Sequence, residues 1–200
     1  MRTSPLERPQ AEVAGAILAQ AFHQEPLSVY LVPEAAERAQ ALRAAFTGWV
    51  RSGRFVVDVC AAGDAILGVA VWSAPTGSVS STVAGEQDND VPDEVRSWST
   101  PAQERFGAYF GYVSAVHRRL MPAPHWYLAL LGVAPPQQGR GYGSALLRSR
   151  LAQADEAGQP CYLETGRERN VTLYRRHGFR VIETGTVPRT GVRFWALRRG

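Results

Sequence analysis

The 200-residue sequence contains no lysine, only two cysteines and no long apolar run. Without lysine there can be no Walker A loop, because that loop needs Gly-Lys-Ser/Thr to contact nucleotide phosphates. Cys60 and Cys161 each lie in an apolar, strand-like segment, so we expect buried reduced thiols and a cytoplasmic protein. The four histidines are scattered without ligand spacing, which predicts no metal site.

Membrane and secretion signals are also missing. No segment approaches the roughly 18 apolar residues of a membrane span, and the first residues, Met1 to Pro5, lack the apolar core of a signal peptide. The composition, with 45% hydrophobic and 20% charged residues, is ordinary for a globular protein. We therefore expect one domain over residues 1–200, with no membrane partner.

Hydrophobic periodicity predicts an alternation of helices and strands. The predicted helices cover about 10–23, 33–52, 101–120, 142–157 and a short stretch from Asn170. The predicted strands cover 55–60, 65–72, 127–133, 160–165, 179–185 and 190–198. Residues 23–31 and 74–96 are expected to be loops; the second is rich in serine, glycine and acidic residues.

The most informative segment is a glycine-rich turn between a predicted strand and a predicted helix. Gly139, Gly141 and Gly143 leave backbone N–H groups uncovered at a helix N-terminus, where the helix dipole favours an anion. Arg140 adds a cation beside them. The dinucleotide fingerprint does not fit, because its third glycine position is Ser144. The turn therefore predicts a site for phosphate groups of another cofactor.

A second motif follows downstream. Residues 161–165 read as a short strand, Asn170 as a helix N-cap and Gly178 as the helix stop. Tyr174 is thereby placed on a short helix directly after a strand.

These two motifs, in this order, resemble the GCN5-related N-acetyltransferase (GNAT) family over roughly the last 75 residues. The resemblance implies an α/β (α+β) fold with a mixed central sheet of about six to seven strands and about four to five flanking helices. It implies acetyl-CoA as cofactor and a direct transfer of the acetyl group without a covalent acyl-enzyme. It also implies a set of residues that would contact the cofactor: Leu131, Gly132, Val133, Gln138, Gly139, Arg140, Gly141, Tyr142, Gly143, Ser144, Asn170 and Arg175.

The resemblance also suggests catalytic roles. Tyr174 would protonate the departing CoA thiolate, since its ordinary pKa of about 10 keeps it protonated at neutral pH; the alternative is a tyrosine of the core. Glu164, at the end of a strand, is a candidate base for the amine, with a surface carboxylate as an equally good reading. His125, His23 and Glu25 are weaker candidates for the base.

Aromatic residues could form the pocket for the acceptor. Tyr30, Trp72, Tyr109, Phe110 and Tyr127 favour an aromatic or hydrophobic amine over a polyamine, although each alone could be core. Segments such as 125–129, 163–165 and 173–179 are similar to puromycin N-acetyltransferases, which implies a small-molecule, antibiotic-like acceptor and a role in resistance.

Other functions stay open at this point. A peptide N-terminal acetyltransferase or a non-catalytic acetyl-CoA-binding regulatory module would share the same core. The net charge of +4 comes with arginines clustered around the predicted cofactor site, so the phosphates of CoA account for it and no nucleic acid is expected. The protein is expected to be a monomer or a homodimer.

Overall fold

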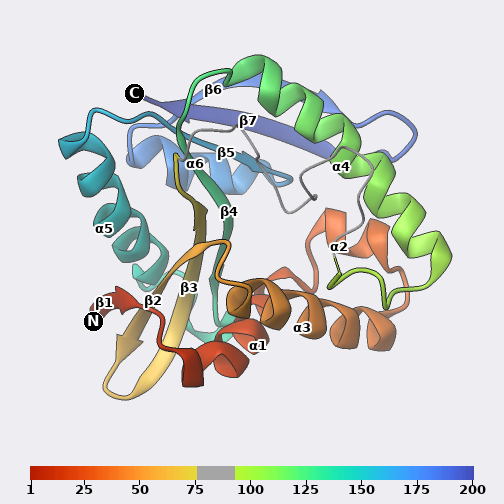
Figure 1. Cartoon of the computed structure of the whole chain (residues 1–200), viewed down its shortest axis with the longest axis horizontal. Helices are drawn as coiled ribbons and strands as arrows, with labels where there is room; N and C mark the ends of the chain where they lie inside the picture. The colour runs from red at the N-terminus through yellow and green to blue at the C-terminus, as the bar shows by residue number, and fades with distance from the viewer. Residues whose placement is uncertain (76–92) are drawn as a thin grey trace.

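The computed structural model describes residues 1–75 and 93–200. A seven-stranded mixed sheet with the order β1-β2-β3-β4-β5-β7-β6 runs through the molecule, and helices cover both of its faces (Figure 1). The strands are β1 (Arg2–Pro5), β2 (Val56–Ala62), β3 (Ala65–Ser73), β4 (Trp126–Val133), β5 (Cys161–Thr165), β6 (Arg180–Thr186) and β7 (Arg193–Arg199). The α-helices are α1 (Ala11–Phe22), α2 (Pro26–Leu31), α3 (Ala35–Arg51), α4 (Thr100–Leu120), α5 (Tyr142–Glu156) and α6 (Glu168–Arg176), with 3-10 turns at Arg8–Gln10 and Pro135–Gln137.

The sheet opens at its middle. In the antiparallel pair of β3 and β4 the register steps over Ala129, which forms a β-bulge. The parallel pair of β4 and β5 is joined only through Trp126 and Tyr127 of β4. Beyond these residues the two strands diverge, as Figure 1 shows. The bulge and the early end of the pairing leave room for a ligand between two central strands.

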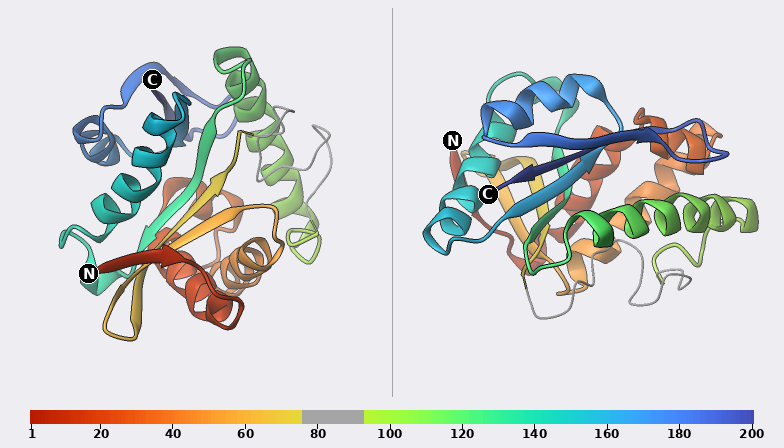
Figure 2. Two further views of the ribbon diagram at one scale, coloured as in Figure 1. Left: turned by 60° about the vertical axis from the view of Figure 1, so that its left-hand side comes forward. Right: turned by 90° about the horizontal axis from the view of Figure 1, so that it is seen from above.

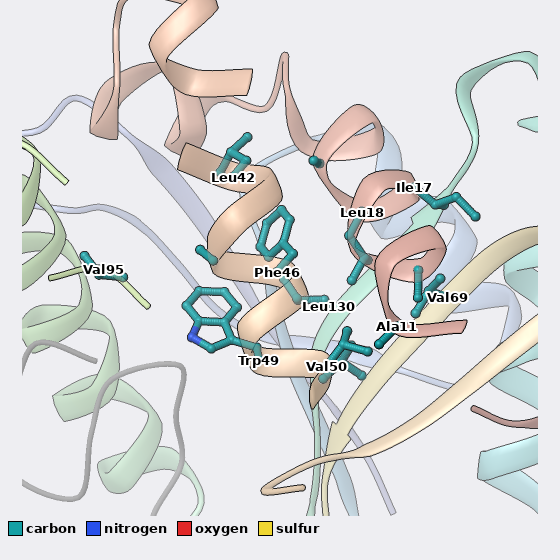
Figure 3. Close-up of a cluster of buried hydrophobic side chains, with 14 of the residues drawn as sticks. Ala11, Ile17, Leu18, Leu42, Phe46, Trp49, Val50, Val69, Val95 and Leu130 are labelled. Carbon is teal, nitrogen blue, oxygen red and sulfur yellow. The ribbon is translucent and has the colours of Figure 1, made fainter. Parts of the chain in front are cut away.

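The faces of the sheet carry separate cores. Side chains alternate along β3, so Val69 and Val71 pack on the face of α1 and α3, whereas Ala70 and Trp72 pack on the face of α5. Figure 3 shows the first core, in which Phe46 of α3 meets the sheet and α1. Each large apolar side chain buried there contributes about 1.5–3 kcal/mol. In Figure 2, α4 and α6 lie on opposite sides of the β5–β7 part of the sheet.

The predicted mixed fold and the predicted sheet of six to seven strands are confirmed, with six α-helices in the described residues where four to five were expected. The first strand, Arg2–Pro5, was not predicted, because its four residues are mostly polar and end in proline at a sheet edge. The predicted loop at 23–31 contains α2, a six-residue helix too short to show periodicity. Its Pro26 occupies a position that suits a helix start.

The prediction that Asn170 is a helix N-cap was wrong. The helix α6 begins earlier, with Arg167 at the N-cap position, and Asn170 lies inside its first turn. The Asn170 Nδ2 instead donates a hydrogen bond to the Thr165 Oγ1 at 3.1 Å, which ties α6 to the end of β5. Most of the predicted 74–96 loop, residues 76–92, lies outside the described part of the chain. Among the described helices, none has the length and apolar character to cross a membrane.

Candidate active site

The glycine-rich turn leaves the start of α5 free to bind an anion. Gly139 has φ +77° and Gly141, the N-cap of α5, has φ +88°, a backbone region that glycine adopts most readily. A Cβ atom added at either residue would meet nothing within 4 Å, so both positions face open space. No side chain caps the helix and its first turn holds no acidic residue. The N–H groups and the positive end of the helix dipole are therefore available to phosphate groups.

A cavity of about 520 Å³ lies where β4 and β5 diverge. It is bounded by the glycine-rich turn, by the ends of β4, β5 and α6, and by α1 to α4. Both predicted catalytic residues, Glu164 and Tyr174, line it. One continuous space therefore joins the anion-binding turn, the two ionisable side chains and an aromatic wall.

Most of the residues predicted to contact the cofactor line this cavity: Leu131, Val133, Gln138, Gly139, Gly141, Tyr142, Gly143, Ser144 and Asn170. Three do not. Gly132 is buried against α1, where an added Cβ would lie 2.9 Å from a methyl group of Leu18. Arg140 and Arg175 are exposed outside the cavity, and Arg169 and Arg176 line it in their place. On α6, a one-residue shift turns a side chain by about 100° around the axis, which separates Arg175 from Arg176.

Glu164 is a buried carboxyl group in a setting of hydroxyl groups. Its side chain is 7% exposed, and desolvation raises its pKa from 4.5 to about 7. The nearby hydroxyl groups of Tyr127 and Tyr162 lower this pKa, but they only partly oppose the effect of burial. The Oε1 atom of Glu164 has no hydrogen-bond partner of normal length. A carboxyl group with a pKa near neutrality can accept a proton and release it again at physiological pH.

Tyr174, unlike Glu164, stays protonated at neutral pH. It lies on α6, is 7% exposed and packs edge-on against Phe179. Burial, and then the charge of Glu25, raise its pKa well above 10, so it keeps its hydrogen throughout the physiological range. Within one cavity, Tyr174 can donate a proton while Glu164 can accept one.

The aromatic wall differs in part from the predicted one. Tyr109, Phe110 and Tyr127 line the cavity, but Tyr30 and Trp72 do not. Trp72 is fully buried on the α5 face of the sheet, because alternation along β3 turns it away from the α1 to α4 side. Tyr30 points to a second, shallower depression beside β7.

Further aromatic residues of the wall were not predicted: Phe22, Phe46, Trp49, Trp98 and Phe106. The sequence places them on the apolar stripes of α1, α3 and α4, or just before α4, where they read as ordinary core. The signal that could have found Phe106 is its helical spacing to Tyr109 and Phe110, both of which were predicted. These side chains make the α1 to α4 part of the cavity strongly apolar.

Two contacts fix the mouth of the cavity. The Arg167 Nε atom lies 2.9 Å from the Glu25 Oε1, and Arg167 also donates to the backbone oxygen of Gln24, so the segment after β5 is tied to the segment before α2. The His177 Nε2 is 3.0 Å from the Ser144 Oγ, which joins the end of α6 to the first turn of α5. No group of His, Cys, Asp or Glu suited to a metal ion occurs within residues 1–75 and 93–200.

A splayed mixed sheet with an open helix N-terminus at the splay, and with Tyr174 and Glu164 lining the cavity there, is an architecture that acyltransferases use. The family model described as the Acetyltransferase (GNAT) family matches residues 72–179, more than half of the sequence. The chain belongs to this family and is an acyltransferase enzyme; enzymes of the family use acetyl-CoA.

One curated relative, an uncharacterised N-acetyltransferase of Schizosaccharomyces pombe, is 37% identical over 54 residues. That match spans 27% of this chain and only 22% of the relative.

Solved structures are similar over almost the whole chain. A Corynebacterium glutamicum structure described as histone acetyltransferase HPA2 and related acetyltransferase is 21% identical, with 98% of this chain and 94% of the other covered and a TM-score of 0.68. A mosquito arylalkylamine N-acetyltransferase-like protein is 13% identical, with coverage of 99% and 98% and a TM-score of 0.66. An agmatine N-acetyltransferase is 18% identical, with coverage of 98% and 97% and a TM-score of 0.62. At these identities the likeness shows the fold.

Proposed function

We propose that the protein transfers the acetyl group of acetyl-CoA directly to the primary amine of a small aromatic or hydrophobic molecule. The observation that carries the proposal is that two ionisable residues line one cavity with an aromatic wall: Glu164, whose pKa burial raises to about 7, and Tyr174, which keeps its hydroxyl hydrogen at neutral pH. The protein would act in the cytoplasm.

The residues present fit acetyl-CoA. The turn from Gln138 to Ser144 offers backbone N–H groups and no acidic side chain to the phosphates, and Arg176 lines the same cavity. A Cβ at Gly143 would make only ordinary van der Waals contact with the Leu131 and Val133 side chains, at 3.8 Å. When bound, acetyl-CoA supplies the acetyl group as a reactive thioester.

The chain's own residues would handle the protons. An amine arrives largely as an ammonium ion and must lose a proton before it can attack, and Glu164 is the buried group able to take it. Tyr174 would donate its hydroxyl hydrogen to the sulfur as the C–S bond breaks, and the second proton lost by the amine nitrogen would restore the Tyr174 hydroxyl group. The exposed backbone of β4 beyond the bulge would orient the carbonyl group of the donor.

The aromatic wall supports an aromatic acceptor. Two of the similar solved structures are named for arylalkylamines and two for agmatine or polyamines. Glu164 and Glu25 are the acidic residues of the cavity lining, against many aromatic ones, so a polyamine with several charges would fit poorly. Puromycin, an aromatic antibiotic with a free amine, belongs to the favoured chemical class, and acetylating it would give a role in resistance.

The test is release of CoA thiol from acetyl-CoA with a panel of amines that includes puromycin, an arylalkylamine, agmatine and a peptide with a free N-terminus. The wild type is compared with Tyr174→Phe. We expect turnover with the aromatic amines and a loss of kcat of about 100-fold or more in the variant, with the affinity for acetyl-CoA retained. Turnover with the peptide alone would indicate a peptide acetyltransferase. Binding of acetyl-CoA without turnover of any amine would indicate a regulatory module.

A further inference from the structure

A pair of buried histidines lies directly behind Glu164. His117 of α4 is 1% exposed and His125, just before β4, is 6% exposed. Their Nε2 atoms are 2.6 Å apart, which is a hydrogen bond. The ring of His117 stacks on Tyr162 with 4.2 Å between the centroids, which fixes its orientation. The proposed acetyl transfer, as described above, does not use either histidine.

The hydrogen bonds determine which nitrogen atoms carry hydrogen. The His125 Nδ1 lies 2.7 Å from the backbone oxygen of Ala123, which can only accept, so this nitrogen is protonated. In a neutral ring the His125 Nε2 is then an acceptor, and the His117 Nε2 must donate to it. The His117 Nδ1 is left with a lone pair, and the nearest acidic atom is the Glu164 Oε1 at 3.8 Å.

The tautomers therefore form a directed chain from the cavity to the surface. The Glu164 Oε1 lies 3.8 Å from a nitrogen that can accept its proton. The distance must shorten by about 1 Å to reach hydrogen-bond length, a movement within the range of a side chain. At the other end, His125 lies beneath the exposed residues Pro122, Ala123 and Pro124.

The reaction needs such an exit. An ammonium ion that becomes an amide loses two protons, of which the CoA thiol retains one at neutral pH. The other must leave a cavity that the donor and the acceptor fill. We propose that Glu164, His117 and His125 form a proton relay that carries this proton from the cavity to the surface at residues 122–124. The relay rests on the proposed acetyl transfer.

Each step is a proton transfer without any change of oxidation state. The amine N–H breaks and Glu164 gains an O–H. That proton passes to the His117 Nδ1 as the His117 Nε2 hydrogen passes to the His125 Nε2. The His125 Nδ1 hydrogen then leaves to water. Both rings end neutral with their hydrogens on the opposite nitrogen. After product release, a proton from water at the His125 Nδ1 drives the same transfers in reverse, and Glu164 gives its proton to water in the emptied cavity, which restores the starting tautomers.

The surrounding groups keep the relay uncharged at rest. Burial, then His125, then Arg118 lower the pKa of His117 to about 3. Burial and the charge of Arg198 lower the pKa of His125, although its bond to Ala123 acts in the opposite direction. A proton on His117 is thus only a transient state.

The relay can be tested without turnover. Nitrogen-15 NMR of the histidine rings in the free protein would give the tautomer of each ring between pH 5 and 9. We expect hydrogen on the His117 Nε2 and the His125 Nδ1 at pH 5.5, and a change in the His117 Nδ1 signal as Glu164 titrates near pH 7. Glu164→Gln should abolish that change. His23 and His177 are internal controls that should not respond to this substitution. Hydrogen on the His117 Nδ1 at pH 5.5, or no response to Glu164, would overturn the relay.

The kinetic test uses His125→Ala, at the surface end, with Ser114→Ala as a matched control on the buried side of α4. We expect kcat of His125→Ala to fall about 10- to 100-fold with an unchanged KM for acetyl-CoA, and added imidazole to restore much of it. Ser114→Ala should behave as wild type. Wild-type kcat in His125→Ala, or a loss that imidazole does not restore in a folded variant, would contradict the relay. If the His117 Nδ1 signal follows the titration of Glu164 as expected but the protein acetylates no amine, only the proposed function is rejected.

Discussion

Glu164 combines burial with a charge that the proposed chemistry needs. Desolvation raises its pKa to about 7, so half of the molecules hold the carboxylate near neutrality. If Glu164 is the base, kcat/KM should rise tenfold per pH unit below about pH 7 and level off above it. In Glu164→Gln this limb should vanish and the rate should fall about 100-fold or more. The pH dependence of CoA release from pH 5 to 9 measures both. If kcat/KM of the variant still rises with pH below about pH 7, the titration belongs to another group.

The same residue should limit stability at alkaline pH. Because its pKa is raised from 4.5 to about 7, the folded state binds the proton more tightly than the unfolded state. Its favourable contribution is complete below pH 4.5 and is lost as the pH rises through 7. Glu164→Gln should therefore be more stable than wild type at pH 8, by up to about 3 kcal/mol for a shift of 2.5 pKa units. Urea unfolding at pH 4 and pH 8 tests this, since the difference should disappear at pH 4.

At the scale of single elements, the turn before α5 depends on the backbone conformation of Gly141. An alanine there would hold φ near +88° at a cost of about 1–2 kcal/mol, and its methyl group would stand in the space that we assign to phosphate. We expect Gly141→Ala to weaken acetyl-CoA binding about tenfold, measured by calorimetry.

Gly63, in the turn between β2 and β3, provides the matched control. It also has a positive φ, of +59°, and open space around its Cα. Gly63→Ala should lower the melting temperature by a similar amount and leave acetyl-CoA binding unchanged. Equal binding losses in both variants would mean that the effect of Gly141→Ala is one of stability alone.

The sequence allows this turn to be predicted because glycine acts locally. Three glycines between an apolar run and a helical pattern define strand, turn and helix without reference to distant residues. The bulge at Ala129 has no such marker, since alanine is compatible with any strand position. Likewise, Asn170 resembles an N-cap in sequence, but its hydrogen bond to Thr165 depends on how α6 meets β5. The sequence therefore predicts features that depend on neighbouring residues, but not contacts that depend on how two elements pack.

At the scale of the whole molecule, the site depends on elements far apart in the chain. Tyr174 and Glu164 could be predicted because they lie in one motif region near the C-terminus. Their partners could not: Glu25 belongs to the segment before α2, and His117 belongs to α4. The aromatic wall likewise comes from α1, α3 and α4, whose apolar stripes predict burial but not which buried side chains border a cavity.

A buried ion pair joins α5 to the sheet, beside the apolar side chains of α5 that pack on the same face. Arg150 of α5 and Asp58 of β2 are 8% and 3% exposed, and two Arg150 nitrogens contact the carboxylate at 2.8–3.1 Å. Arg150 also donates to Gln153 and lies over the ring of Trp126. Asp58→Ala would leave a buried guanidinium without its counter-charge, so we expect a loss of about 3–5 kcal/mol in unfolding free energy.

Replacing both partners separates the ion pair from the packing. The double variant Asp58→Leu/Arg150→Met removes both charges and keeps most of the volume. Its loss of unfolding free energy should therefore be much smaller than the sum of the losses in the two single variants, which leaves its stability close to that of the wild type. Because α5 carries the anion-binding turn, the single variant Asp58→Ala should also weaken acetyl-CoA binding, and the double variant should recover it. Chemical unfolding and calorimetry on the wild type, on the single variants Asp58→Leu and Arg150→Met, and on the double variant measure both effects, with Asp58→Ala beside them. Additive losses of stability would show that the two residues act independently. Recovered stability without recovered binding would show that the ion pair positions the turn, beyond holding the helix to the sheet.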